Sequence, residues 1–146
     1  MLNHKEILGT YLNYSYVYYD QATDHVCAAY DNFDKEIKKM GNLFARDPST
    51  PAGGILLEND KEVIAGIIYT VNPQSIRILS GFVEEQHRGN KIYKALHQYL
   101  DRVAKHHNKK HITSTIHANN NTMLNQIGPS LGYKIVCHLV HRKVSE

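Results

Sequence analysis

A strand-like run that passes through a short polar loop into an amphipathic helix constrains this chain most. Apolar residues run to Val83, and the loop spans residues 84–91. The first backbone N–H groups of a helix have no internal partners, and with the positive end of the helix dipole they attract anions. Arg88, Lys91 and Lys94 add three cationic side chains. The stretch therefore predicts a site for a phosphate or pyrophosphate group.

The length and composition of the chain are typical of one globular domain. A chain of 146 residues can form a hydrophobic core without disulfides or metal ions. The apolar fraction of 42% and the charged fraction of 21% exclude a disordered chain. No apolar run approaches the roughly 18 residues of a membrane-spanning helix, and the first residues lack the apolar segment of a signal peptide. We expect a single domain over residues 1–146, in the cytoplasm and without membrane contact.

Charge and cysteine content exclude further classes. The net charge of +3 is spread along the chain without a long basic run, so nucleic acid binding is not indicated. The two cysteines, Cys27 and Cys137, are too few for a disulfide framework and are predicted to be buried thiols. The histidine-rich segment 106–111 spans a predicted helix end and strand start, with lysines between the histidines. A solvated turn accounts for it better than a metal site, and we expect no metal.

The hydrophobic pattern predicts strands and helices in alternation. Residues 14–19 indicate a first strand, although residues 7–14 fit a short helix equally well. Helical spacing from Thr23 to Met40 fits one bent helix or two short ones. Three antiparallel strands follow, and then a helix, a strand, a helix and a last strand. These later elements are predicted at residues 55–58, 63–71, 76–83, 92–105, 111–117, 119–132 and 134–142.

Two residues near the loop carry local signals. Gly81 interrupts a strand-forming run and indicates a β-bulge or a close approach to the backbone. Asn90 is a residue type suited to cap the helix that follows. The predicted fold class is α+β (α/β), with a mixed, mostly antiparallel central sheet flanked by helices in the order β-α-α-β-β-β-α-β-α-β.

Two motifs in this order of elements resemble those of the GNAT superfamily of N-acetyltransferases. The first is Gln86-His87-Arg88-Gly89 after Val83 and ahead of the helix, which resembles the family's pyrophosphate-binding motif. The second is Asn121 with the later Leu131-Gly132-Tyr133-Lys134, which resembles the asparagine and the Gly-Phe pair of the family's late helix and strand. The resemblance covers residues 54–142 and extends to the N-terminal third by position only.

The resemblance implies that acetyl-coenzyme A (acetyl-CoA) binds between splayed fourth and fifth strands. Backbone groups near Phe82 and Val83 would pair with its pantetheine arm, and Asn121 would contact it from the late helix. The pyrophosphate would be held by Arg88, Gly89, Asn90, Lys91, Ile92, Tyr93 and Lys94. The implied reaction is direct transfer of acetyl to an amine of a small molecule or protein. The implied partners are this donor and the amine acceptor, and a homodimer is common in the family.

The chain departs from the family pattern in its phosphate motif and in its acid–base groups. Lys91 and Tyr93 stand where the motif has small residues. Lys91 can supply charge in compensation, whereas Tyr93 must turn away or stack. The fourth-strand positions that often hold a base fall near Arg77, Leu79 and Gly81, and the late tyrosine that protonates the thiolate falls at Gly128. The remaining catalytic candidates are Glu84, His117 and Tyr133, with Glu84, or a water that it orders, as the preferred base.

Two functions from different classes fit these residues. The first is an acetyl-CoA-dependent N-acetyltransferase. The second is a GNAT-like sensor or interaction module that binds an acyl-CoA with little or no turnover. The altered phosphate motif and the missing acid favour the second more than they would in a typical member, and the acceptor amine is left open.

Overall fold

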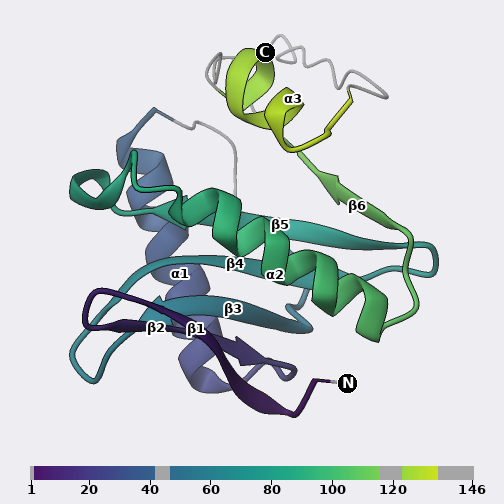
Figure 1. Cartoon of the computed structure of the whole chain (residues 1–146), viewed down its shortest axis with the longest axis horizontal. Helices are drawn as coiled ribbons and strands as arrows, with labels where there is room; N and C mark the ends of the chain where they lie inside the picture. Colours follow the sequence, from purple (N-terminus) through teal and green to yellow (C-terminus); the bar gives the residue numbers. More distant parts are fainter. Residues whose placement is uncertain (1, 42–46, 116–122, 135–146) are drawn as a thin grey trace, which may run out of the picture. The chain divides into compact units, whose positions relative to one another are not determined.

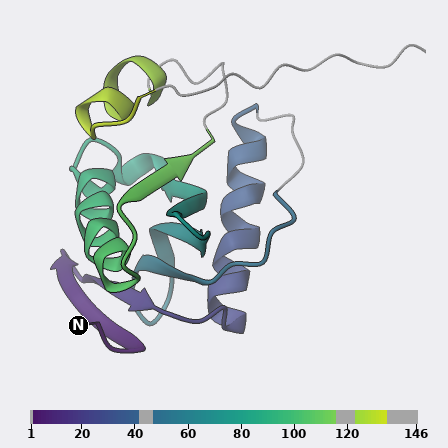
Figure 2. The same ribbon diagram turned by 90° about the vertical axis from the view of Figure 1, so that its right-hand side faces the viewer.

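The computed structural model of the chain describes residues 2–41, 47–115 and 123–134. The chain divides into two compact units, Met1–Thr115 and Ile116–Glu146, which are described separately. The larger unit contains one six-stranded sheet, whose strands lie side by side in the order β1 (Lys5–Tyr11), β2 (Tyr14–Tyr19), β3 (Gly53–Glu58), β4 (Val63–Val71), β5 (Ser75–Val83) and β6 (His111–Ser114). Helix α1 (Asp24–Lys39) covers one face of this sheet and helix α2 (Ile92–His106) the other (Figures 1 and 2).

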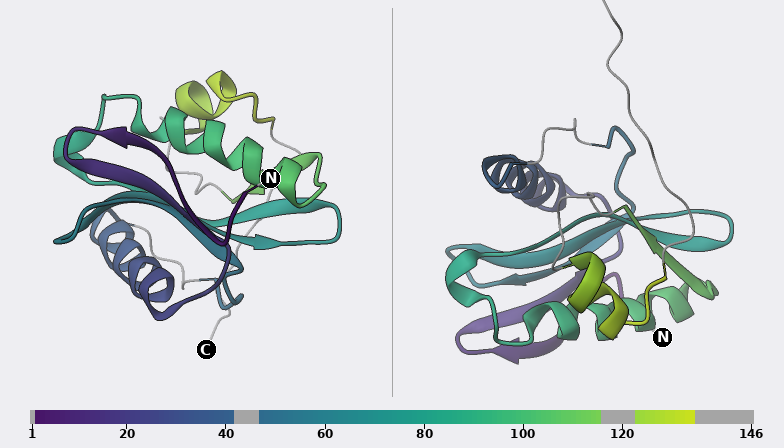
Figure 3. Two further views of the ribbon diagram at one scale, coloured as in Figure 1. Left: turned by 60° about the horizontal axis from the view of Figure 1, so that its bottom comes forward. Right: turned by 90° about the horizontal axis from the view of Figure 1, so that it is seen from above.

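The sheet is mixed and mostly antiparallel, as predicted. Neighbouring strands are antiparallel except for β5 and β6, which are parallel because α2 connects them as a crossover. Figure 3 shows the sheet between its two helices from two further directions. The elements of this unit are β1 (Lys5–Tyr11), β2 (Tyr14–Tyr19), α1 (Asp24–Lys39), β3 (Gly53–Glu58), β4 (Val63–Val71), β5 (Ser75–Val83), the 3₁₀ turn η1 (Glu85–His87), α2 (Ile92–His106) and β6 (His111–Ser114).

The N-terminal third differs from the predicted element order in two ways. A short helix was an alternative for residues 7–14, but Lys5–Tyr11 form the edge strand β1, which pairs with β2 as a hairpin. Most side chains of β1 stay exposed or half-buried, so its sequence carries little of the alternation that marks a strand. The segment after Thr23, which fitted one bent helix or two short ones, forms one continuous helix, α1. The Thr23 hydroxyl caps its start.

Each helix buries one apolar stripe. In α1, the Phe33 ring lies 5.3 Å from the Phe82 ring of β5. In α2, Tyr99 lies against Tyr16 of β2, with 5.1 Å between ring centroids. The buried apolar residues of α1 are Val26, Ala29, Tyr30 and Phe33, and those of α2 include the predicted Ile92, Leu96, Leu100 and Val103.

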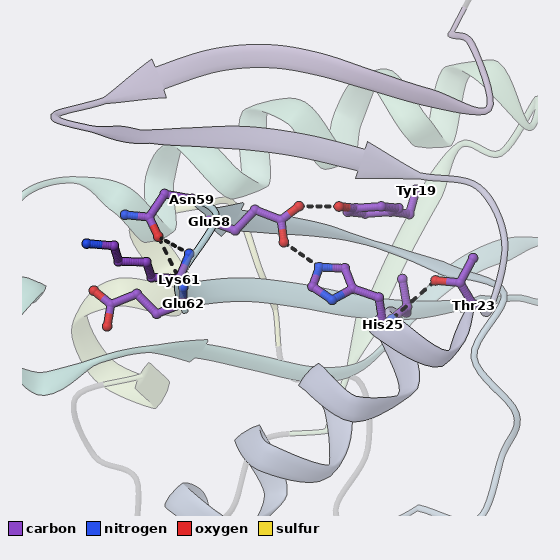
Figure 4. Close-up of polar contacts among 8 residues, drawn as sticks. Tyr19, Thr23, His25, Glu58, Asn59, Lys61 and Glu62 are labelled. Carbon is purple, nitrogen blue, oxygen red and sulfur yellow. Dashed lines mark hydrogen bonds and ion pairs between the residues drawn. The ribbon is translucent and has the colours of Figure 1, made fainter.

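The Glu58 carboxylate connects β2, β3 and the first turn of α1 (Figure 4). One of its oxygens accepts a hydrogen bond from the Tyr19 hydroxyl, and the other lies 2.5 Å from His25 Nε2. The Glu58 side chain is only 11% exposed, and a carboxylate in such a position needs partners for its oxygens. This contact fixes the start of α1 against the sheet.

In the smaller unit the described residues form a helical segment, as predicted. It consists of η2 (Met123–Ile127) and the short α3 (Gly128–Ser130). The last predicted strand lies outside the described residues apart from its first position, Lys134. No helix in the described part of the chain has the length and apolarity needed to span a membrane.

Candidate functional site

The C-terminal half of β5 has a strand on only one side in the part of the chain that the structure describes. Strand β6 pairs with β5 over Ser75–Ile78 only. Strand β4 pairs with β5 along its whole length, up to Val83. Within residues 2–41, 47–115 and 123–134, no strand pairs with the other edge of residues 79–83. We call this segment the open edge of β5.

A β-bulge marks the point at which the open edge begins. Ile68 of β4 is opposite Ser80, and the next residue, Tyr69, is opposite Ile78, so Leu79 is the extra residue on β5. The sequence predicted a bulge or a close approach at Gly81. The bulge lies two residues earlier, and the close approach is found at Gly81 itself.

The bulge changes which β5 side chains share a face of the sheet. In a regular strand, Leu79 and Gly81 would point the same way. Instead Leu79 packs against the core under α1, whereas Gly81 faces Tyr93 of α2. The strand positions grouped from the sequence as Arg77, Leu79 and Gly81 therefore do not form one row. Their regular spacing does not hold because the bulge adds a residue between Ile78 and Ser80.

Ser80 follows the bulge and was missed from the sequence. Its side chain is 8% exposed, and its Oγ has no hydrogen-bond partner among the described residues. A buried hydroxyl without a partner is costly, so such groups often mark a bound water or a functional site. A single serine within a strand carries no sequence signal of its own, because its burial depends on contacts with other elements.

An ion pair lies on β5 just before the bulge. Arg77 Nη1 is 2.5 Å from Asp47 Oδ2, and Arg77 Nη2 donates to Ser49 Oγ at 2.8 Å. The Arg77 and then the Ser49 hydrogen bonds lower the pKa of Asp47 from 3.8 to about 2. The Tyr30 hydroxyl of α1 donates to the Asp47 carbonyl at 3.1 Å. This pair therefore connects α1, β5 and the segment that leads into β3.

Helix α2 begins with three backbone N–H groups that lack helical partners. The Ala95 N–H makes the first helical hydrogen bond, to Lys91 O at 3.1 Å. The N–H groups of residues 92–94 precede it and are available to an anion. Asn90 is not the N-cap that its residue type suggested, because its side chain donates to the His87 carbonyl at 3.0 Å and Lys91 occupies the cap position.

Lys91 has a backbone conformation that glycine favours. Its φ is 61° and its ψ is 19°, in the left-handed region. A residue other than glycine pays a conformational cost in this region. Its exposed side chain adds a positive charge beside the free N–H groups.

Arg88 is held against the end of β5. Its Nε donates to the Val83 carbonyl at 2.9 Å, and its Nη2 lies 3.3 Å from Met40 Sδ at the end of α1. The guanidinium carbon is 6.0 Å from the centre of the Phe82 ring. Arg88 therefore occupies a carbonyl at the far end of the open edge.

Tyr93 turns back onto the sheet. A Cβ added at Gly81 would overlap the Tyr93 hydroxyl and lie 3.0 Å from Tyr93 Cε1. The Tyr93 ring also packs against His97, with 4.6 Å between ring centroids. Burial raises the pKa of Tyr93 to about 12. The ring is thus accommodated because β5 has a glycine opposite it.

The sequence matches the Acetyltransferase (GNAT) family over residues 15–125, which include both covering helices, the bulge and the loop. The chain belongs to the GNAT acetyltransferase family. Members of this family use acetyl-CoA as the acyl donor. No curated protein matches the chain at a significant level.

Solved structures with the GNAT fold resemble the chain at low sequence identity. An assumed acetyl transferase from Pyrococcus furiosus has a TM-score of 0.68 and 17% identity, over 90% of this chain and 99% of that one. An aminoglycoside acetyltransferase from an uncultured soil metagenomic sample, in complex with sisomicin, has a TM-score of 0.63 and 11% identity, over 86% and 92%. The aminoglycoside N-acetyltransferase AAC(6')-Iy, in complex with CoA, has a TM-score of 0.53 and 12% identity, over 66% and 69%. At these identities the likeness shows the fold alone.

In this GNAT chain, the predicted base Glu84 lies directly after β5. Its N–H donates to Ile64 O at 2.8 Å, and its carboxylate accepts a hydrogen bond from the Gln86 side chain. A hydrogen bond to Glu62 raises the pKa of Tyr14, and the nearby Glu84 carboxylate adds to this shift. Glu84 is therefore four residues beyond Ser80, beside the tip of the β1–β2 hairpin.

The same hairpin tip supports the loop between β5 and α2 of the GNAT chain. The ring of His87, in η1, makes edge contacts with Tyr11 at 5.9 Å and with Tyr14 at 5.8 Å between centroids. Three rings from two parts of the chain thus fix the position of η1.

The remaining predicted site residues are not all described. His117 and Asn121 lie outside the described residues. Tyr133 belongs to the smaller unit, where its N–H donates to Gly128 O at 3.0 Å. The roles assigned to these three residues stay predictions.

Proposed function

We propose that this chain is an N-acetyltransferase that transfers acetyl from acetyl-CoA to a primary amine of a small molecule or a protein. The observation that supports this best is the placement of the open edge of β5. It begins at a bulge and leads directly to a helix start with three free N–H groups. An added chain along that edge would end at a site for anions, which suits a long arm attached to a pyrophosphate.

The residues present fit coenzyme A in charge and in backbone geometry. The N–H groups of residues 92–94 would hold the pyrophosphate, with charge from the exposed Lys91 and Lys94. Backbone groups of Phe82 and Val83 would pair with the pantetheine arm. Arg88 must release the Val83 carbonyl if the arm uses it, and its guanidinium is then free for a phosphate oxygen. When bound, acetyl-CoA supplies an activated acyl group.

The chain's own groups would prepare the amine for attack. The acceptor must lose a proton before it can act as a nucleophile, and Glu84, or a water that it orders, is the proposed base. The proposed reaction takes place in the cytoplasm, and a homodimer is the proposed assembly. The two aminoglycoside enzymes named above make aminoglycosides a reasonable first group of acceptors to test, beside polyamines, amino acids and peptides.

Thiol release from acetyl-CoA, measured with such a panel of amines, tests the proposal. We expect at least one amine to raise release well above the rate of hydrolysis. Glu84→Gln should then lower turnover by about 100-fold or more, which is the usual contribution of a general base. Glu85→Gln is the matched control, because Glu85 is the adjacent exposed carboxylate. Binding of acetyl-CoA without release for any amine would support the sensor function instead.

A further inference from the structure

The departing group of the proposed reaction needs a hydrogen-bond donor. Attack of an amine on a thioester breaks the carbon–sulfur bond and leaves the negative charge on sulfur. A donor placed where this charge develops lowers the barrier. The relevant donors are those beside the open edge of β5, between the bulge and the start of α2.

The Tyr93 hydroxyl is in this region. It lies over Gly81, in the middle of the open edge and two residues, or roughly 7 Å of strand, beyond the bulge at Leu79. The hydroxyl has no hydrogen-bond partner among the described residues, and the side chain is half-buried. Because Gly81 has no side chain, this hydroxyl lies directly against the backbone of β5 at that position.

We propose that the Tyr93 hydroxyl donates a hydrogen bond to the sulfur of coenzyme A when the thiolate departs. This inference rests on the proposed function, because it requires the pantetheine arm to lie along the open edge. It assigns the role to the second residue of α2, at a position where the family motif has a small residue.

The proton balance favours a hydrogen bond over complete transfer. The pKa of Tyr93 is raised to about 12, whereas a free thiol has a pKa of about 8.5. The proton therefore stays on the phenol while the thiolate is bound. The thiolate takes its proton from solvent after release, and the proton lost by the amine leaves through the base. Tyr93 is unchanged at the end of the reaction.

His97 holds the Tyr93 ring in place. Its ring packs against the Tyr93 ring, and its Nδ1 lies 3.1 Å from the Tyr93 carbonyl, to which it donates. Burial lowers the pKa of His97, so the neutral ring is favoured. The phenol therefore contacts both Gly81 and His97, which makes His97 a positioning residue.

A binding measurement tests the inference without any amine. The dissociation constants of CoA and of desulfo-CoA, which lacks the sulfur, are compared by calorimetry at pH 9.5. At this pH the CoA thiol is mostly ionised, while Tyr93 keeps its proton. A hydrogen bond to a charged sulfur should make wild-type protein bind CoA about 10-fold or more tightly than desulfo-CoA. At pH 7 the ratio should be smaller because less thiolate is present.

Tyr93→Phe should bring the ratio close to one and leave the affinity for desulfo-CoA unchanged. Tyr99→Phe is the matched control, because Tyr99 lies on the same helix with its hydroxyl against another glycine, Gly9. It should keep the wild-type ratio. Gly81→Ala displaces the phenol and should lower the ratio as Tyr93→Phe does, with thermal unfolding as the check that each variant is folded.

The possible results separate the two proposals. If neither ligand binds to the wild-type protein, the proposed function and this inference both fail. If both ligands bind and the wild-type ratio is near one, only the inference fails. It also fails if Tyr93→Phe keeps the ratio, or weakens both ligands equally, since the phenol would then contact another part of the arm or none.

Discussion

The Tyr93 hydroxyl of α2 lies over Gly81 of β5, at a point where no side chain other than hydrogen could fit on the strand. A Cβ at position 81 would overlap the Tyr93 hydroxyl, so the tyrosine side chain needs a glycine on the strand. The absence of a side chain at Gly81 explains how the start of α2 accommodates a tyrosine.

Replacement of Lys91 by glycine should have opposite effects on stability and on binding. The left-handed conformation costs a lysine about 1 kcal/mol or more, part of which glycine recovers, so Lys91→Gly should raise the free energy of unfolding by about 0.5 to 1 kcal/mol. Loss of the charge should weaken acetyl-CoA binding roughly fivefold. Chemical unfolding and calorimetry measure the two effects.

Asn108→Gly is the control for this prediction. Asn108 also has a positive φ, of 57°, but it lies at the other end of α2. The variant should be stabilised without a change in affinity. A Lys91→Gly protein that binds acetyl-CoA as tightly as the wild type would contradict a role for this side chain at the phosphate site.

The Arg77–Asp47 pair should stabilise the fold in a way that acid removes. The pKa of Asp47 is lowered to about 2, so the pair contributes fully above pH 4 and its contribution is lost as pH falls toward 2. Both side chains keep more than a quarter of their surface exposed, 28% and 29%, so we expect only about 1 kcal/mol. Asp47→Asn should unfold more easily than wild type at pH 6 and equally at pH 2. An equal difference at both pH values would exclude this origin.

Removal of the Ser80 hydroxyl should stabilise the protein. The buried Oγ has no partner in the described part of the chain, so Ser80→Ala should raise the free energy of unfolding by about 1 kcal/mol. Urea unfolding measures this change. A clear destabilisation would mean that the hydroxyl is satisfied, for example by a bound water.

The three-residue contact at Glu58 should be cooperative. Tyr19→Phe leaves one carboxylate oxygen without its donor and should cost about 1 kcal/mol, and His25→Ala removes the partner of the other oxygen. Because both changes act on one carboxylate, their effects in a double-mutant cycle should differ from additivity by about 0.5 kcal/mol or more. Additive effects would show that the two contacts are independent.

Local patterns predicted much of the fold. The apolar stripe of α2, with Leu96 and Leu100, was read correctly because helix periodicity depends only on neighbouring residues. The turn residues gave the antiparallel order of β3, β4 and β5 for the same reason. The edge strand β1 was less evident because few of its side chains are buried.

The site depended more on contacts between distant residues. The bulge at Leu79 is set by pairing with β4, so no property of the β5 sequence alone places it there. The burial of Ser80 likewise depends on the elements packed against β5. The contact between Tyr93 and Gly81 joins α2 to β5. In the sequence it was visible only as a glycine within a predicted strand and as a tyrosine at a position where the family motif has a small residue.

Calorimetric titration with acetyl-CoA tests the central claim most directly. We expect saturable binding at one site per chain, weakened by Lys91→Ala and weakened further when Arg88→Ala is added, because Lys91 caps the start of α2 and Arg88 lies at the end of β5 in the loop that leads to it. Absence of binding at millimolar acetyl-CoA would contradict the account.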